Sequence, residues 1–394
     1  MNKNELKIKI EILVLLLPYL DAPIFIYANP MIADIFNYWK IATIPLIILL
    51  YLGNNIKPSR ISWLTGFYGL SGFISVLINR GDIADGLITV GMPVAIVLIM
   101  DYCSRYKVFV LEICTIIFEV LIYSNLISII LYPNGVVTGV GIKLGGTAGQ
   151  TWYVLGMRNN FILFLLPGLT FAFLYMIYSK NYKRAYYLYL ATLLQIILTG
   201  SATSLLVVIV FGAIFFIPKL NNNLFYYLWV CIGANILIVL LNIQNKLKVL
   251  KWFITKVLKR SLDFTNRTEI WKLAIKKIKL APIFGYGNTM TLSFLGRREK
   301  FSGGSTVPDH AHNHWLQVLI YGGFVGLISY VILLTSCIKK IEIVENKKIK
   351  TVMRASLAAL FVLSVTQPFI YQPRIFFLYS LSFVMADFQE INEQ

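Results

Sequence analysis

Three histidines, the only ones in the chain, lie within five residues at His310, His312 and His314. An imidazole titrates near neutrality, so one of them could act as a general base at the edge of a site. A zinc site is the second interpretation, because alternate residues of a strand, or His310 and His314 one helical turn apart, have the spacing of metal ligands. No further convincing cluster of ligands accompanies them. The third interpretation is a polar helix entrance, with Asn313 as its cap and Trp315 at a membrane interface.

Arg267 is a second candidate because of its place on a predicted helix. The helix is expected to run from Asn266, its N-cap, to the residue before Pro282, with Glu269 completing a capping box. Its apolar face carries Arg267 and Trp271, where an arginine meets the unfavourable positive end of the helix dipole. Arg267 is therefore either a solvated side chain or, with the free N–H groups of the first turn, a receptor for an anion. The other apolar positions are Ile270, Ala274, Ile275 and Ile278, and Lys272, Lys276 and Lys279 point away from them.

The elements that carry these residues must be membrane spans. Of the 394 residues, 58% are hydrophobic and 14% are charged, and the mean hydropathy is +0.72. In a soluble domain roughly a quarter of all residues are charged. The low charged fraction and high hydropathy of this chain therefore exclude a cytosolic enzyme, a collagen and a disordered chain. The absence of a hydrophilic basic domain excludes a nucleic-acid partner. The four cysteines have no paired spacing and are predicted to be packing residues.

Apolar runs long enough to cross a bilayer predict twelve spans. They cover residues 10–28, 38–53, 62–78, 86–100, 108–131, 160–178, 185–199, 203–218, 224–242, 315–337, 353–370 and 374–388. The predicted fold class is therefore all-α, a polytopic membrane helix bundle of about 12 transmembrane helices with a large helical extracytoplasmic loop. The expected organisation is spans one to nine in residues 1–242, a basic catalytic loop in 243–314, and spans ten to twelve with a cytoplasmic C-terminus in 315–394.

The distribution of Lys and Arg predicts the orientation of these spans. Seventeen of the 36 basic residues fall in the segments on the side of the N-terminus, and five fall in the short loops on the other side. Because short basic loops resist translocation, both ends are expected in the cytoplasm and the long loop outside. That loop holds the remaining 14 basic residues against four acids. Its charge either attracts anionic membrane lipids or holds an anionic substrate at the surface.

Glu119 is expected near the middle of the fifth span, where an unpaired carboxylate is costly. It should face the bundle interior and either pair with a donor or stay protonated. Its role is then to stabilise the fold or, as the alternative, to position an arginine such as Arg158.

The histidine segment and its surroundings resemble the O-antigen ligase and O-antigen polymerase superfamily of bacterial membrane glycosyltransferases. The family's loop motif is a histidine followed by Asn, Ser or Gln, nine residues, a glycine, two residues and another small residue. It is matched in full by His312, Asn313, Gly323 and Gly326. The resemblance covers the whole predicted topology, whereas the specific motifs occupy a small part of it.

Two arginines also resemble family positions. Arg267 and Trp271, with Pro282, Gly285 and Gly287 downstream, resemble the family's segment before the histidine. Arg158 lies in the stretch 156–160 before the sixth span and is similar to the family's other outer-face arginine.

The resemblance implies an enzyme of the bacterial cytoplasmic membrane that transfers a glycan from undecaprenyl pyrophosphate to an acceptor glycan or glycolipid, without a nucleotide sugar, a metal or another cofactor. His312 would be the catalytic base of an inverting displacement, on the outer face. Arg158 and Arg267 would bind the pyrophosphate, whose developing charge needs fixed cations. The supporting residues would be Asn313, His310, His314 and Trp271. A flippase and a chain-length regulator are the implied protein partners.

Three functions stay open. A polymerase joins repeat units into capsular, exo- or O-antigen polysaccharide, and a ligase moves finished glycan to lipid A-core or another acceptor. Richness in Ile, Lys, Asn, Phe and Tyr suggests an AT-rich genome, and many such hosts lack an outer membrane, which favours a polymerase of capsule or exopolysaccharide. A polysaccharide-lipid flippase or transporter is the alternative from another class, and it would use a central cavity instead of a basic outer loop.

Overall fold

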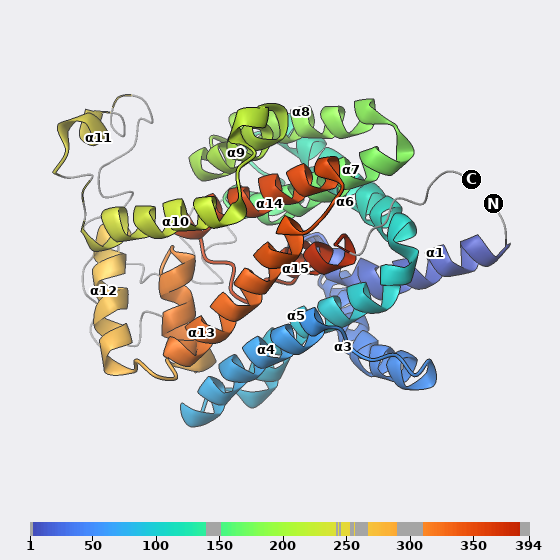
Figure 1. The fold of residues 1–394 in the computed structure, drawn as a ribbon, viewed down its shortest axis with the longest axis horizontal. Coiled ribbons are helices and arrows are strands. Elements are labelled where there is room, and N and C mark those ends of the chain that lie inside the picture. Colours follow the sequence, from blue (N-terminus) through green and yellow to red (C-terminus); the bar gives the residue numbers. More distant parts are fainter. Residues whose placement is uncertain are drawn as a thin grey trace.

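The structure is a computed structural model that describes residues 3–138, 151–241, 243, 246–252, 256, 267–289 and 310–386. This part of the chain is almost entirely helical (Figure 1), as expected where apolar segments must satisfy their backbone polar groups without water. The α-helices are α1 Lys3–Leu16, α2 Phe25–Ala28, α3 Pro30–Gly53, α4 Arg60–Ile78, α5 Ile83–Tyr102, α6 Lys107–Leu131, α7 Ile162–Ser179, α8 Tyr182–Thr199, α9 Ala202–Phe216, α10 Leu224–Asn235, α11 Lys248–Trp252, α12 Arg267–Leu280, α13 His314–Glu342, α14 Lys347–Thr366 and α15 Pro373–Val384. Short helical turns are η1 Leu17–Leu20, η2 Cys103–Tyr106, η4 Pro218–Leu220, η5 Ile236–Leu240 and η8 Gly287–Thr289.

Six helical segments are long and apolar enough to cross a membrane: Pro30–Gly53, Arg60–Ile78, Ile83–Leu131, Ile162–Ser179, His314–Glu342 and Lys347–Thr366. Shorter apolar helices cover Ala202–Phe216, Leu224–Leu240 and Pro373–Val384. The all-α membrane class is thereby confirmed. The predicted number of twelve spans is not confirmed, and the division of the chain at residues 242 and 314 stays a prediction.

The first predicted span, residues 10–28, is not one helix. Helix α1 ends at Leu16, and the chain continues through η1 and the short α2. Pro18 lies at the start of η1, where its ring and missing N–H prevent a continuous α-helix. The sequence-based boundaries were therefore wrong at this end of the molecule.

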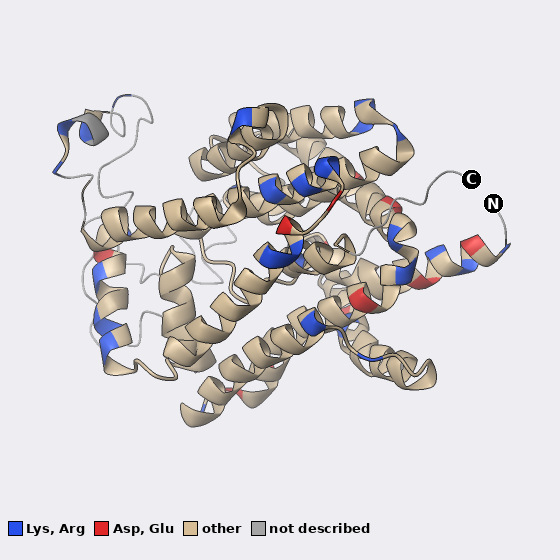
Figure 2. Cartoon of the chain, in the orientation of Figure 1, with Lys and Arg blue, Asp and Glu red and all other residues tan. Residues whose placement is uncertain are grey.

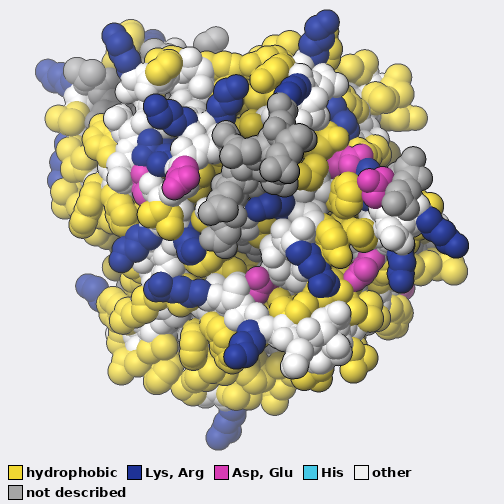
Figure 3. Space-filling view, turned by 45° about the vertical axis from the view of Figure 1, so that its right-hand side comes forward, with side chains coloured by type: hydrophobic (Ala, Val, Ile, Leu, Met, Phe, Trp, Pro, Cys, Tyr) yellow, Lys and Arg dark blue, Asp and Glu magenta, His cyan; other side chains and the backbone are white. Residues whose placement is uncertain are grey.

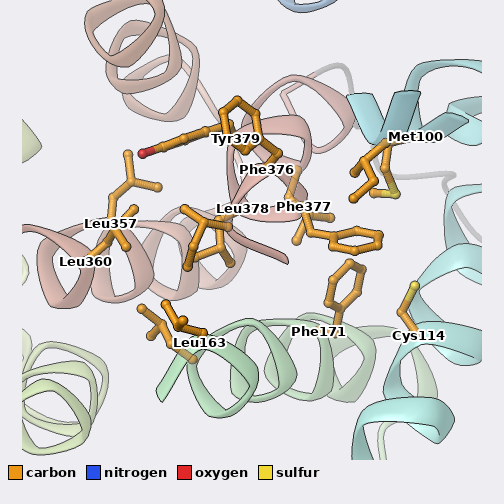
Figure 4. Close-up of a cluster of buried hydrophobic side chains, with 14 of the residues drawn as sticks. Met100, Cys114, Leu163, Phe171, Leu357, Leu360, Phe376, Phe377, Leu378 and Tyr379 are labelled. Carbon is orange, nitrogen blue, oxygen red and sulfur yellow. The ribbon is translucent and has the colours of Figure 1, made fainter. Parts of the chain in front are cut away.

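The helices pack around a core that runs through the middle of the bundle. Figure 4 shows Phe171 of α7 and Phe377 of α15 facing each other, and their ring centroids lie 5.8 Å apart in an edge-to-face arrangement. Helix α7 is buried along most of its length because it is apolar on all sides. In Figure 1, α12 lies across one end of the bundle, and α1 begins near the opposite end.

A small antiparallel sheet precedes α7. Its strands are β1 Val137–Thr138, β2 Thr151–Tyr153 and β3 Gly156–Met157, in the order β1-β2-β3. The N–H of Leu155 donates to Oδ1 of the buried Asn125 at 2.8 Å, which ties the β2–β3 turn to α6. This sheet places Arg158 directly before α7.

Charged residues are concentrated at the two ends of the bundle. Figure 2 shows the lysines of α12 at one end, and many of the other Lys and Arg residues toward the other end. These include the first turn of α14 and the last turn of α13. Figure 3, which brings that side forward, shows Lys and Arg scattered over the surface with few acids.

Glu119 of α6 does pair with a donor, but the donor is Arg184 and not Arg158. Nε and Nη2 of Arg184 donate to Oε1 and Oε2 of Glu119 at 2.6 and 2.5 Å. The Glu119 side chain is 12% exposed and that of Arg184 is 31% exposed. This two-pronged pair joins α6 to the first turn of α8, whereas Arg158 contacts the last residue of α8, so it supports the stabilising role.

We expect Glu119→Gln to lower the stability of the purified protein by about 1 to 3 kcal/mol, because Arg184 would keep its charge at a partly buried place without a carboxylate. Thermal unfolding in detergent measures the effect. Glu112→Gln is the matched control, since Glu112 is 24% exposed against 12% for Glu119 and its ion pair with Lys9 should contribute less. A loss of activity per folded molecule at unchanged stability would contradict the structural role.

Candidate functional site

Helix α12 packs against the first part of α13 through the apolar face that its sequence predicts (Figure 1). Trp271 and Ala274 are buried in a separate cluster with Leu316 and Ile320 of α13 and Val239 of η5. Burying the indole removes a large apolar area from water and favours this docking. The predicted outward lysines 272, 276 and 279 are exposed. The predicted helix and its docking are confirmed, whereas its cap Asn266 lies outside the described residues.

The far end of α12 is fastened to a break in α13. At Gly323 the backbone has φ 60° and ψ −157°, outside the helical region. The N–H groups of Phe324 and Val325 are thereby free to donate to the carbonyl oxygens of Pro282 and Ile283, at 2.8 and 3.1 Å. A side chain at Gly323 would overlap the Ile283 carbonyl, and the positive φ also requires glycine. The motif glycine therefore fixes the segment that follows α12.

His312 lies just before α13 in an unusual backbone conformation. Its φ of +48° is in the left-handed region, which non-glycine residues seldom adopt. Its N–H donates to Nδ1 of His310 at 3.2 Å, and the two ring centroids lie 4.1 Å apart. On its other side, the N–H of Ala311 donates to Oε1 of Gln317 at 2.8 Å. Strained residues of this kind are kept only where the surroundings hold them, and they cluster at functional sites.

The surroundings of His312 keep its imidazole neutral. Burial is the main cause that lowers its pKa, to about 3, and the charges of His310 and Arg267 add to the effect. Its ring is therefore neutral throughout the physiological range and able to accept a proton. A base with so low a pKa transfers protons inefficiently, but an anion bound at Arg267 would offset the guanidinium charge and raise the pKa.

Asn313 caps α13 and ties it to two other helices. Its Oδ1 accepts from the N–H of Leu316 at 2.9 Å. Its Nδ2 donates to Oδ1 of Asn235 in α10 at 2.6 Å and to the carbonyl of Val365 in α14 at 3.0 Å. The predicted cap is present, and its contacts set the position of His312 relative to three helices.

His314 faces away from His312, into the bundle. Its ring stacks on Phe369 with centroids 3.8 Å apart, and its Nδ1 accepts from the N–H of Phe369 at 3.2 Å. The ring also meets Tyr330 edge-on. His310 precedes the helix, so His310 and His314 are not one helical turn apart, which removes that form of the zinc interpretation. Among the described residues, no group of three or more His, Cys, Asp or Glu side chains has metal-binding geometry.

The two arginines bind the C-terminal carbonyls of two helices. Nη1 of Arg158 donates to the carbonyl of Thr199 at the end of α8 at 3.3 Å, and Nη1 of Arg267 donates to the carbonyl of Thr366 at the end of α14 at 2.8 Å. A cation is favourable at the negative end of a helix dipole. Arg158 is exposed and Arg267 is half-buried. Each of these two hydrogen bonds uses a single nitrogen of its arginine, and a guanidinium group carries five N–H donors in all.

A short chain of contacts connects the two arginines. Asn160, two residues after Arg158, accepts through Oδ1 from Nε2 of Gln367 at 3.1 Å. Gln367 directly follows Thr366, the residue whose carbonyl Arg267 holds. The segment 366–367 therefore lies between the elements that carry the two arginines, and His312 is close enough to Arg267 for its charge to act on the imidazole.

Three polar residues of this region were not singled out from the sequence. Asn235 and Gln367 each lie in or next to an apolar helix, and an amide inside a predicted span is a signal that could have identified them. Lys277 is the third, because it is only 2% exposed although its neighbours on α12 are solvated. Its Nζ lies 5.4 Å from the ring centroid of Tyr286, and burial lowers its pKa.

Comparison with known proteins agrees with this architecture. Residues 187–331 match a family described as O-antigen ligase. This segment contains α12, the histidines and both motif glycines. The matched segment is thus similar to the O-antigen ligase family. Arg158 lies outside it, so the family match does not extend to that residue.

A similar protein is a candidate polysaccharide ligase of Rickettsia felis. It is 26% identical over 191 residues, which make up 45% of this chain and 45% of that protein. The chain thus matches less than half of the relative's length. The resemblance to the O-antigen ligase and polymerase superfamily is confirmed, and the chain is an integral membrane protein.

Proposed function

We propose that this O-antigen ligase family protein is a membrane glycosyltransferase that moves a glycan from undecaprenyl pyrophosphate to the hydroxyl group of an acceptor. The observation that carries the proposal is His312, a neutral and half-buried imidazole in a strained conformation beside Arg267. A neutral imidazole next to a fixed cation suits a reaction in which a hydroxyl loses a proton while a pyrophosphate gains charge.

In this mechanism His312 takes the proton of the acceptor hydroxyl as the oxygen attacks the anomeric carbon. Arg267 and Arg158 stabilise the leaving pyrophosphate on the opposite side of the sugar, so the configuration inverts. His310 positions His312 by accepting a hydrogen bond from the backbone N–H of His312, and Asn313 caps the start of α13. Trp271 keeps α12 docked, whereas the buried His314 packs the helix end.

The charge distribution supports an orientation in the bacterial cytoplasmic membrane with both termini inside and His312 at the outer face. Many Lys and Arg residues lie toward the end where α1 begins (Figure 2), as the positive-inside rule requires of a cytoplasmic side. We also propose that the chain crosses the membrane twelve times and that its protein partners are a flippase and a chain-length regulator.

Between the two family activities, composition favours a polymerase of repeat units for capsule or exopolysaccharide. The name of the Rickettsia relative favours a ligase instead. The lipid-linked glycans of a deletion strain distinguish them: single repeats accumulate if a polymerase is lost, and long chains accumulate on the lipid if a ligase is lost. In both cases purified protein should transfer glycan between lipid-linked substrates in vitro. Flipping without transfer would identify a carrier and contradict the proposal.

The pH dependence of transfer should reflect the environment of His312. Because its pKa lies at about 3, below the ordinary 6.5, the free enzyme keeps a neutral base as the pH falls through 6.5. The acid limb of kcat/KM, which reports the free enzyme, should therefore lie well below pH 6. Bound pyrophosphate offsets Arg267 and raises the pKa, so the acid limb of kcat should lie at higher pH. Steady-state rates measured down to about pH 3, where the free-enzyme pKa lies, cover both limbs. Coincident limbs would contradict the coupling.

Transfer should survive removal of divalent metals. In this mechanism the guanidinium groups supply the positive charge and His312 removes the proton, so neither step requires an ion. Purified enzyme incubated with EDTA should keep its initial rate within about twofold. Loss of a catalytic metal would instead cost several kcal/mol of transition-state stabilisation, a far larger fall in rate. Inhibition that Zn²⁺ or Mg²⁺ reverses would restore the metal interpretation of the histidine segment.

A further inference from the structure

A cavity of about 440 Å³ opens between helix ends, far from His312. Its walls come from the start of α4, the turn η2 between α5 and α6, and the last turns of α13 and α15. Helix α13 rises 1.5 Å per residue, so Lys340 at the cavity is roughly 40 Å along the helix path from His314. The cavity is therefore separate from the candidate active site and independent of the proposed function.

The cavity is strongly basic. Its lining includes the cationic side chains of Arg60, Arg105, Lys107 and Lys340, and one carboxylate, Asp101. In the described part of the chain, neither Arg60 nor Arg105 forms an ion pair. Arg105 instead lies over the ring of Tyr102, with Cζ 4.4 Å from the centroid.

Asp101 offsets one of these positive charges, and the start of α4 holds its carboxylate in place. Its Oδ2 accepts from the backbone N–H of Ser59 at 2.7 Å, from Oγ of Ser62 at 2.8 Å and from the hydroxyl of Tyr51 at 3.1 Å. Three donors thus hold one oxygen in place. Arg60 and Arg105 alone outnumber the one lining carboxylate, so the cavity has an excess of positive charge.

Two further features point to the kind of anion. The first turn of α4 faces the cavity, and Oγ of its N-cap residue Ser59 is buried without a hydrogen-bond partner among the described residues. Guanidinium groups and hydroxyl donors bind phosphoryl oxygens well. The opposite wall is apolar and contains Phe383 and Val384 of α15, and Nζ of Lys340 lies 5.5 Å from the Phe383 ring centroid.

We propose that this cavity binds the phosphoryl headgroup of an anionic phospholipid from the adjacent leaflet. The cationic side chains hold the phosphate, and the apolar wall contacts the first carbons of the lipid. Basic pockets between the ends of membrane helices bind anionic lipids in this way. A soluble phosphate has the same charged group but makes no use of the apolar wall.

The test uses the purified full-length protein in neutral detergent after removal of bound lipid. Binding of short-chain phosphatidylglycerol, of phosphatidylcholine with the same chains, and of inorganic phosphate is measured by native mass spectrometry. The variant Arg60→Gln/Arg105→Gln removes two cavity charges from exposed positions. Lys183→Gln/Lys219→Gln is the control, since both lysines are exposed and neither lines the cavity.

We expect the wild type to prefer phosphatidylglycerol, and the cavity variant to bind it about thirtyfold more weakly, as loss of two near-surface charges predicts. The control should bind like the wild type. If the double variant fails to fold, Arg105→Gln alone should still weaken binding about fivefold. Equal losses in the variant and the control, or equal binding of both lipids, would overturn the site. Binding of inorganic phosphate that depends on the two arginines, without binding of phosphatidylglycerol, would overturn the lipid as its ligand.

Discussion

Replacing His312 with asparagine should lower the rate of glycan transfer by about 10² to 10⁴, the usual effect of losing a general base. Asparagine tolerates the left-handed conformation that this position has, so the backbone around His312 should remain in place. The variant removes the imidazole while it keeps a short polar side chain. Initial rates with purified enzyme and lipid-linked substrate measure the effect.

Variants of the two neighbouring histidines distinguish loss of the base from disturbance of its surroundings. His310→Ala removes the acceptor of the His312 N–H but leaves the base itself, so its rate should fall less. His314→Gln should act mainly on stability, because that ring is stacked inside the bundle. Near-normal transfer by folded His312→Asn protein would exclude His312 as the base.

Replacing Arg267 with lysine should weaken binding of undecaprenyl pyrophosphate by about 10- to 100-fold, the range that the loss of a hydrogen bond to a charged group predicts. A lysine keeps the charge but cannot reproduce a two-pronged contact with phosphate. Arg158→Lys should have an effect of the same kind. Equilibrium binding to the purified variants measures both.

The double variant tests whether the two arginines share one ligand. Contacts through Gln367 place their elements next to each other, so we expect the two losses to be non-additive. Lys272→Gln is the matched control, because Lys272 lies on the exposed side of α12 and should not affect binding. Additive losses would mean two independent sites. A loss equal to that of Arg267→Lys in the control would point to general attraction by the basic loop.

The sequence by itself determined the class of the protein and its local elements. Its apolar composition required a membrane protein, and the spacing of Trp271, Ala274 and Ile278 determined which side of α12 would be buried. The cap at Asn313 and the need for glycine at Gly323 also follow from local backbone chemistry. These features depend on residues a few positions apart, and periodicity and capping rules describe such short distances well.

Only the tertiary structure decided which side chains meet. Arg158 and Arg267 could be identified as candidates, but their positions at the ends of α8 and α14 depend on carbonyls 41 and 99 residues away. Glu119 had to find a donor, and packing chose Arg184. The inward direction of His314 and the left-handed backbone of His312 likewise result from contacts with Phe369, Gln317 and Asn235. Such contacts are set by the packing of whole helices, and the local sequence around each residue carries no record of the partner that packing brings to it.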